Sequence, residues 1–210
     1  MTPNLYSLRI VVINSVVPPE HANDPAAWEQ AERARLLRIG LLQAGYNIIA
    51  SLPADAFVAE RIAQLQPDMI VVDAESDARD ALEHVVMATR DAPRPIVLFT
   101  DDHDQATAQQ AIAAGVSAYV VAGLQPERVQ PVLEVAMARF QHEQSLLAEL
   151  HDAKTKLSER KVVERAKGVL MNRHQLTEEQ AYQRLRKQAM EKGMRLAELA
   201  QRILDVADLI

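Results

Sequence analysis

The sequence predicts an α/β domain followed by an all-helical tail. In the first 125 residues, short apolar runs rich in β-branched residues alternate with helical stretches, which is typical of a doubly wound parallel sheet. From residue 126 onward the apolar residues recur at helical spacing. The charge divides in the same way, because residues 1–153 carry a net −11 and residues 154–210 a net +5. We therefore expect an acidic sheet domain joined to a basic helical tail.

Five strands and five helices are predicted in order along the first domain. The strands are Leu8–Ile13, Asn47–Ala50, Met69–Val72, Ile96–Phe99 and Ala118–Val121. The helices lie near residues 26–44, 55–65, 77–91, 104–114 and from 126 onward. In open sheets of this kind ligands bind at the carboxyl ends of the strands, so functional residues are expected there.

The residues at these strand ends resemble those of response-regulator receiver domains. Asp73 follows the third strand, Thr100 follows the fourth, and Gly115-Val116-Ser117-Ala118-Tyr119 leads into the fifth. The resemblance implies a receiver-like (flavodoxin-like) fold of five parallel strands over residues 1–125. It also implies that Asp73 stands at the position of the phospho-acceptor and Thr100 at that of its hydroxyl partner.

Two other parts of a receiver's phosphorylation site are missing from this sequence. Asn14 and Ser15 replace the acidic pair that holds magnesium, and Ala122 replaces the lysine that pairs with the phosphoryl group. We therefore predict a pseudo-receiver in which Asp73 and Thr100 are vestigial. Asp73 is then expected to be solvated or to cap the next helix, and Thr100 to act as a helix cap. A regulator activated by phosphorylation of Asp73, with an RNA- or DNA-binding output, stays open as the alternative.

Residues 126–156 predict a long linker helix with a coiled-coil seam. Seam residues recur at spacings of four and three and continue into the basic segment, as Val129, Leu133, Ala136, Phe140, Glu143, Leu147, Leu150, Lys154, Leu157 and Lys161. A parallel two-stranded coiled coil, and hence a homodimer, is the natural interpretation. Because Glu143, Lys154 and Lys161 are polar, a helix that packs within its own chain stays open.

The tail predicts a compact bundle of three helices. The charged segment from Glu159 runs into the apolar step Ala166–Met171 without a break. Thr177 with Gln180 three residues later is a capping box that opens a second helix, and a third amphipathic run follows the breaker Gly193. We expect the core of the bundle to contain Leu170, Met171, Leu185, Met190, Leu196 and Ile203.

The same tail resembles the ANTAR module of bacterial antitermination regulators. The residues that carry the resemblance are Glu159-Arg160, Ala166-Lys167-Gly168-Val169-Leu170-Met171, Thr177-Glu178-Glu179-Gln180-Ala181-Tyr182, Leu185-Arg186, Ala189-Met190, Leu196-Ala197 and Ile203-Leu204. It implies an ANTAR RNA-binding domain over residues 157–210 that binds paired stem-loops in leader mRNA, so that RNA polymerase reads past a terminator. RNA polymerase would be an indirect partner.

The residues expected to contact RNA are mainly the cations of this tail, because phosphate contacts supply most non-specific affinity. They are Arg160, Lys161, Arg165, Lys167, Arg173, Arg184, Arg186, Lys187 and Arg195, and Tyr182 is expected either to stack on an unpaired base or to pack in the bundle. Gly168 inside a helix costs about 1 kcal/mol relative to Ala, which predicts close approach of another backbone, from a neighbouring helix or from RNA.

The first domain adds a resemblance to the NasT branch of these regulators, which is related to AmiR. It rests on Val85-Val86, Arg90-Asp91, Pro93–Val97, Phe99-Thr100-Asp101, Ala111-Ile112, Gly115–Tyr119 and Val135–Phe140. The branch implies control of nitrate and nitrite assimilation genes. It also implies a nitrate/nitrite-sensing partner, similar to periplasmic binding proteins, that holds the regulator inactive.

Composition argues against several other classes of protein. The chain has no cysteine and its histidines show no ligand spacing, so we expect no metal or cofactor. Without paired acids, a nucleophile with its base or a glycine-rich phosphate loop, we expect no enzymatic activity. The absence of long apolar stretches and of a secretory pattern at Met1–Leu5 predicts a cytoplasmic location. A DNA-binding regulator stays open, although the tail shows no evident helix-turn-helix.

Overall fold

The computed structural model describes residues 8–14, 25–73, 78–121 and 125–207. The chain divides into two compact units, Met1–Glu143 and Gln144–Ile210. Ser15 and Ala122, two of the positions that argue against phosphorylation, lie outside the described residues. Their part in that argument therefore stays a prediction from the sequence.

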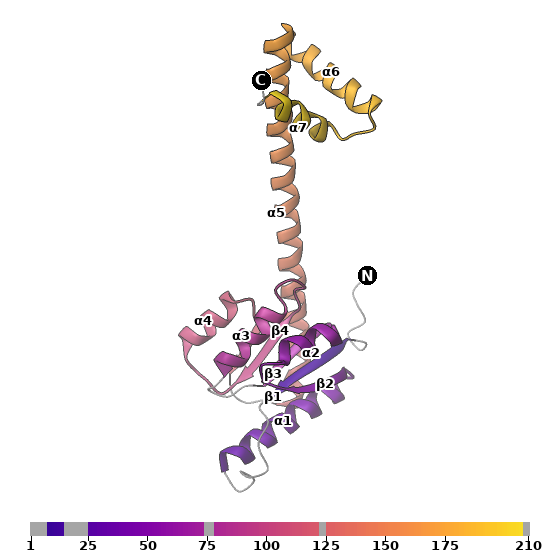
Figure 1. Ribbon diagram of the computed structural model, residues 1–210. Coiled ribbons are helices and arrows are strands. Elements are labelled where there is room, and N and C mark those ends of the chain that lie inside the picture. Colours follow the sequence, from indigo (N-terminus) through magenta and orange to yellow (C-terminus); the bar gives the residue numbers. More distant parts are fainter. Residues whose placement is uncertain (1–7, 15–24, 74–77, 122–124, 208–210) are drawn as a thin grey trace. The chain divides into compact units, whose positions relative to one another are not determined.

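The first unit is a five-stranded parallel sheet with helices on both faces (Figure 1). Its strands are β1 (Arg9–Asn14), β2 (Asn47–Pro53), β3 (Met69–Asp73), β4 (Ile96–Thr100) and β5 (Ala118–Val121), in the order β2-β1-β3-β4-β5. Its helices are α1 (Pro25–Gln43), α2 (Val58–Leu65), α3 (Ala78–Ala88), α4 (Gln105–Ala113) and the first part of α5 (Pro126–His174). The predicted receiver-like, doubly wound fold is confirmed.

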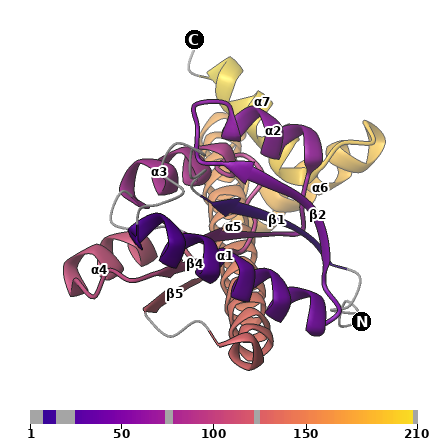
Figure 2. The same cartoon turned by 90° about the horizontal axis from the view of Figure 1, so that it is seen from below.

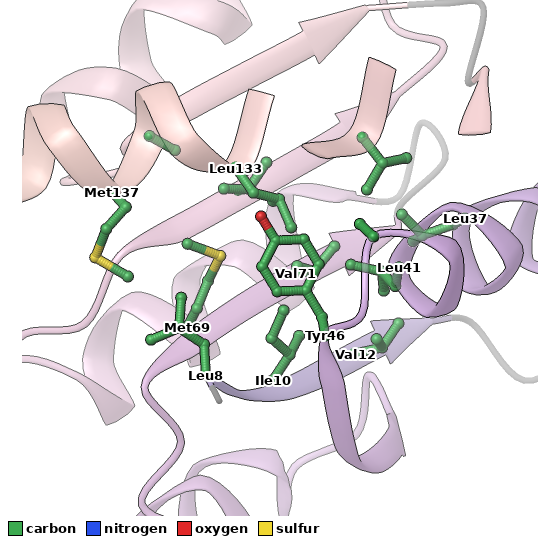
Figure 3. Close-up of a cluster of buried hydrophobic side chains, with 14 of the residues drawn as sticks. Leu8, Ile10, Val12, Leu37, Leu41, Tyr46, Met69, Val71, Leu133 and Met137 are labelled. Carbon is green, nitrogen blue, oxygen red and sulfur yellow. The ribbon is translucent and has the colours of Figure 1, made fainter. Parts of the chain in front are cut away.

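Two apolar cores lie on opposite faces of this sheet because successive strand residues point to opposite sides. Ile10 and Val12 of β1 belong to one core, with side chains of α1 and α5. Val11 and Ile13 belong to the other, with side chains of α2, α3 and α4. Figure 2 shows these helices around the strands, and Figure 3 shows Leu133 of α5 above the first core.

Several predicted boundaries in this unit are wrong, and helix α2, for example, begins at Val58 instead of residue 55. β2 continues to Pro53 instead of ending at Ala50, and Pro53 pairs with Asn14. β2 lies at the edge of the sheet, where a proline is tolerated because one side of the strand needs no hydrogen-bond donor. Helix α3 ends at Ala88, before the predicted residue 91.

Helix α5 is continuous over 49 residues and combines the last receiver helix with the predicted linker. Val129, Leu133 and Ala136 are buried in the first core, so the prediction that they form a coiled-coil seam is wrong. They pack against the sheet of their own chain. Further along α5, Leu147, Leu150 and Leu157 are 50–56% exposed, and pairing through them stays a prediction.

The second unit contains the three predicted tail helices. The C-terminal part of α5 packs with α6 (Glu178–Glu191) and α7 (Leu196–Ala207) around a core that includes Ala166, Leu185 and Leu204. The capping box of α6 is confirmed, since the Thr177 hydroxyl accepts from the backbone N–H of Gln180 and the Gln180 side chain accepts from the backbone N–H of Thr177.

The prediction that Met190 lies in the core of the tail is wrong. Met190 is 73% exposed, because it follows Ala189 by one residue and is turned by about 100° from the buried stripe of α6. The predicted breaker Gly193 has a φ of +62°, in the left-handed region that glycine adopts without strain. The backbone N–H of Met194 donates to the Ala189 carbonyl, so the end of α6 is closed by backbone hydrogen bonds.

Candidate nucleic-acid interface

Exposed cations lie on each part of the second unit. Those predicted to contact RNA are Arg160, Lys161, Arg165 and Arg173 on α5, Arg184, Arg186 and Lys187 on α6, and Arg195 just before α7. The side chains on α5 are exposed because its buried stripe, which includes Ala166 and Leu170, packs against α6 and α7. The arrangement offers phosphate-binding groups from several helices at once.

Two of these cations also have contacts inside the unit. An Nη2 N–H of Arg173 donates to the carbonyl of Ala207, near the end of α7, at 3.5 Å. The ammonium of Lys187 lies 3.9 Å from the Glu191 carboxylate, one turn along α6. Both side chains stay exposed, and such surface pairs are weak enough for a phosphate to replace them.

Lys167 differs from the other predicted contacts, because it is only 6% exposed. Its ammonium donates to the carboxylates of Glu164 at 2.9 Å and of Glu178 at 2.7 Å, and so joins α5 to the first turn of α6. The hydrogen bonds that the ammonium donates to Glu164 and Glu178 raise the pKa of Lys167, which keeps it charged. This position does not support the prediction that Lys167 is a freely accessible phosphate contact.

An open pocket of about 440 Å³ lies beside this ion pair. Its walls are Lys167 from α5 and Glu178, Glu179 and Tyr182 from α6. Glu178 and Tyr182 are four residues apart and so lie on the same face of the helix. Tyr182 is 39% exposed, which leaves its ring accessible to a ligand.

Gly168 is half-buried on α5, one turn after the exposed residues Glu164 and Arg165. A Cβ atom built at this position has no heavy atom within 4 Å, apart from its chain neighbours and the adjacent helix backbone. The sequence predicts that either a neighbouring helix or RNA approaches Gly168 closely. The prediction of a neighbouring helix is therefore wrong within the described chain. Approach by RNA stays a prediction.

The residues predicted to form a vestigial phosphorylation site lie at the carboxyl edge of the sheet in the first unit. Asp73 and Thr100 are the last residues of the adjacent strands β3 and β4, and both are buried. Asn14 pairs in register with Asp73 at the same edge. The topology thus brings together the positions that the sequence assigned to one site.

Arg33 of α1 reaches into this site, although no pattern in the sequence predicts its presence there. Its Nε donates to Oδ1 of Asp73 at 3.0 Å, its Nη2 lies 2.9 Å from the same oxygen, and its Nη1 donates to Asp101. The prediction that Asp73 is solvated is therefore wrong, since it is buried. The alternative, that Asp73 caps the next helix, involves residues 74–77, which lie outside the described residues. Burial raises the pKa of Asp73, while the charge and hydrogen bond of Arg33 act in the opposite direction.

The predicted capping role of Thr100 is also wrong. Its hydroxyl accepts from the backbone N–H of Asp102, within the loop. The cap of α4 is Asp104, whose carboxylate accepts from the backbone N–H groups of Ala106 and Thr107. These hydrogen bonds lower the pKa of Asp104, together with the one from the Thr107 hydroxyl, which is the largest cause.

The described residues hold no cluster of three or more histidine or acidic side chains that could bind a metal ion. Within the same residues, no helix combines the length and the apolar character that crossing a bilayer requires.

Comparisons with known proteins show a family match in the tail and relatives with known names. Residues 151–204 match the model of the ANTAR domain, beginning inside the segment that the sequence analysis assigned to the linker. The chain is 29% identical over 180 residues to the transcriptional regulatory protein PdtaR of Mycobacterium tuberculosis, covering 83% of this chain and 87% of that protein. A stretch of 63 residues is 48% identical to the nitrate regulatory protein of Klebsiella oxytoca, covering 30% of this chain and 16% of that protein.

The first unit has neighbours among solved structures. The signal receiver domain of a modulated diguanylate cyclase from Desulfovibrio desulfuricans matches with a TM-score of 0.50 and 19% identity, covering 65% of this chain and 98% of that domain. At that identity the likeness shows the fold alone. The chain therefore combines a receiver-like fold with a segment, residues 151–204, that matches the ANTAR domain.

Proposed function

We propose that this protein is an RNA-binding transcription antiterminator that binds tandem stem-loops in leader mRNA. The observation that carries the proposal is the ANTAR domain with exposed cations on α5 and α6. The two relatives, a transcriptional regulatory protein and a nitrate regulatory protein, support a regulatory role. We further propose that the targets are nitrate and nitrite assimilation genes. The match to 16% of the length of the nitrate regulatory protein supports this part of the proposal.

The active form in this proposal is a homodimer, since two ANTAR domains suit two stem-loops. Leu146, Leu147, Leu150 and Leu157 are exposed on the middle of α5, which supports pairing with a second copy. The pairing is confined to the part of α5 beyond Phe140, because the earlier seam residues already pack against the sheet.

Control comes from a nitrate- or nitrite-sensing inhibitor protein in this proposal, rather than from phosphorylation. The position of Arg33 supports the proposal that phosphorylation does not control the protein. A carboxylate that accepts hydrogen bonds from a guanidinium is a weaker nucleophile, and Arg33 already supplies a cation at the Asp73 oxygen. A phosphoryl group with magnesium would have to displace it.

Fluorescence anisotropy of the full chain tests the proposal without any phosphodonor. The probes are a tandem hairpin RNA, a single hairpin and a duplex DNA, each at several salt concentrations. We expect binding that is tightest for the tandem RNA. Equal binding to duplex DNA would favour a DNA-binding regulator. Binding that appears only after Asp73 is phosphorylated by a small phosphodonor with magnesium would favour the phosphorylation-activated alternative.

A further inference from the structure

We propose that the pocket formed by Lys167, Glu178, Glu179 and Tyr182 binds one unpaired guanine base of the RNA. Tyr182 stacks on the base, the Glu178 carboxylate accepts from its Watson–Crick edge, and Lys167 holds that carboxylate in place. This inference rests on the proposed RNA-binding function and assigns base selectivity to one site within it.

The charge of the pocket selects a base rather than a phosphate. Glu178 is 69% exposed at the pocket and Glu164 is 53% exposed beside it, so both present negative charge to solvent. A carboxylate repels phosphate oxygens, and when ionised it only accepts hydrogen bonds. The groups of RNA that can donate to it are the N–H groups of the bases and the 2′-hydroxyls.

Glu178 is held ready to accept such hydrogen bonds. Lys167 donates to Oε1 of Glu178 at 2.7 Å, which lowers the pKa of Glu178 and keeps it ionised at neutral pH. Lys167 itself is buried and also donates to Glu164 at 2.9 Å, so its position is set from two sides. Lys167 is therefore a positioning residue, whereas Glu178 contacts the ligand.

Guanine fits this acceptor better than the other bases. Its N1–H and N2–H₂ groups are adjacent donors, and a carboxylate can accept both at once. The corresponding edges of adenine, cytosine and uracil each pair a donor with an acceptor instead, and an acceptor facing a carboxylate is repelled. The face of the base is recognised separately, because every base can stack on an aromatic ring such as Tyr182.

The backbone around the pocket leaves room for RNA. Gly168 follows Lys167 directly on α5, and the space where its Cβ would lie is open. Arg160, seven residues before Lys167 and therefore on the same side of α5, is exposed and available to a phosphate. A nucleotide could therefore place its base against Glu178 and Tyr182 while its phosphate meets the cations of α5.

The test compares guanine with inosine, which lacks the N2 amino group and is otherwise identical. The probes are tandem hairpin RNAs with adenine loops that carry one guanine, moved through each loop position in turn. At the recognised position, we expect replacement of guanine by inosine to weaken binding to the full chain about tenfold, the loss of one hydrogen bond to a charged group. In the Glu178→Gln variant the preference for guanine over inosine should disappear.

Matched variants separate recognition from folding. Glu198→Gln changes another exposed glutamate that pairs with a cation, Arg202 at 3.0 Å, and should leave the preference for guanine intact. Tyr182→Phe should bind almost as well as the natural chain, whereas Tyr182→Leu should bind roughly 5- to 100-fold more weakly. Circular dichroism melting should show that each variant is folded at the assay temperature.

The possible results distinguish this inference from the proposed function. Tight binding of the tandem RNA with equal affinity for guanine and inosine at every loop position would overturn the guanine site alone. So would a Glu178→Gln variant that still prefers guanine. If the natural chain binds none of these RNAs, the proposed function fails and the guanine site fails with it.

Discussion

Arg33 provides a permanent positive charge at the carboxyl edge of the sheet. It hydrogen-bonds the buried Asp73 and reaches the exposed Asp101 from a helix that precedes both in sequence. A buried ion pair adds little net stability, since both charges must leave water. Removing one partner, in contrast, leaves an unpaired buried charge, which is strongly destabilising.

We expect Arg33→Met to lower the free energy of unfolding by about 3–5 kcal/mol at neutral pH. Arg33 opposes the effect of burial on Asp73, so its loss raises the pKa of Asp73 further. The folded variant then takes up a proton at a higher pH than the unfolded chain, and its deficit should shrink as the pH is lowered from neutral. Urea unfolding at several pH values measures this.

The variant Arg33→Met with Asp73→Asn is the control for that experiment, because it removes the buried charge together with its partner. It should recover most of the lost stability and show little of the pH dependence. If the double variant is as unstable as Arg33→Met, then Arg33 contributes through packing of its side chain and not through its charge.

Gly168 gives a second prediction for a single residue. Gly168→Ala meets no atom of the chain and improves helix propensity, so it should raise the free energy of unfolding by roughly 0.5–1 kcal/mol. If RNA approaches α5 here, the same methyl group should weaken binding of a tandem hairpin RNA. Thermal unfolding and anisotropy on the same sample separate the two effects, and unchanged affinity would contradict an approach at Gly168.

Helix α5 has two parts with different surroundings. Its first part is buried against the sheet through residues such as Leu133, while its middle part exposes leucines to solvent. The heptad spacing continues through both parts, so the periodicity alone does not separate a core helix from a coiled-coil helix. Burial in the folded unit makes that distinction.

Replacing Leu147, Leu150 and Leu157 together by serine should convert a dimer to a monomer, because the seam loses its apolar contacts. Sedimentation equilibrium over a range of concentrations measures this. Leu42→Ser removes a similarly exposed leucine from α1 and should leave the oligomeric state unchanged. A natural chain that is monomeric at every concentration, with or without RNA, would contradict the proposed dimer.

The start of α6 depends on its capping box. Thr177→Ala removes the hydroxyl that accepts from Gln180 and should destabilise the second unit by about 1 kcal/mol. Faster amide hydrogen exchange in α6, with unchanged exchange in β3, would locate the effect in this helix. Equal changes in both elements would instead indicate that the two units unfold together.

Across the whole molecule, the acidic and basic parts of the sequence have different roles. The net −11 of residues 1–153 disfavours contact with RNA, and the net +5 of residues 154–210 favours it. Because each phosphate contact releases counterions, the proposed binding should weaken steeply with salt.

Arg165→Gln should reduce the slope of log affinity against log salt concentration by about 0.7–0.9, the value for one phosphate contact. Arg35→Gln changes an exposed arginine of the sheet unit and should leave the slope unaltered. Anisotropy titrations with a tandem hairpin RNA measure both. Identical slopes for the natural chain and Arg165→Gln would show that Arg165 does not contact a phosphate of the RNA.

Local patterns in the sequence were sufficient to determine the order of strands and helices. They also identified the capping box at Thr177, the breaker Gly193 and the division of charge. These features depend on residues a few positions apart, whose periodicity, hydrogen bonds and backbone preferences act within one element. The placement of Asp73 and Thr100 at one edge of the sheet followed from the same order, because parallel strands end on the same side.

Only the tertiary structure decided which side chains of these elements meet. Arg33 and Asp73 are 40 positions apart, and Lys167 reaches Glu178 across the junction of two helices. The burial of Lys167, the exposure of Met190 and the two environments of α5 likewise depend on how separate elements pack. The period of a helix defines a face but does not say what covers it, so charge and burial at these positions were settled only when the elements came together.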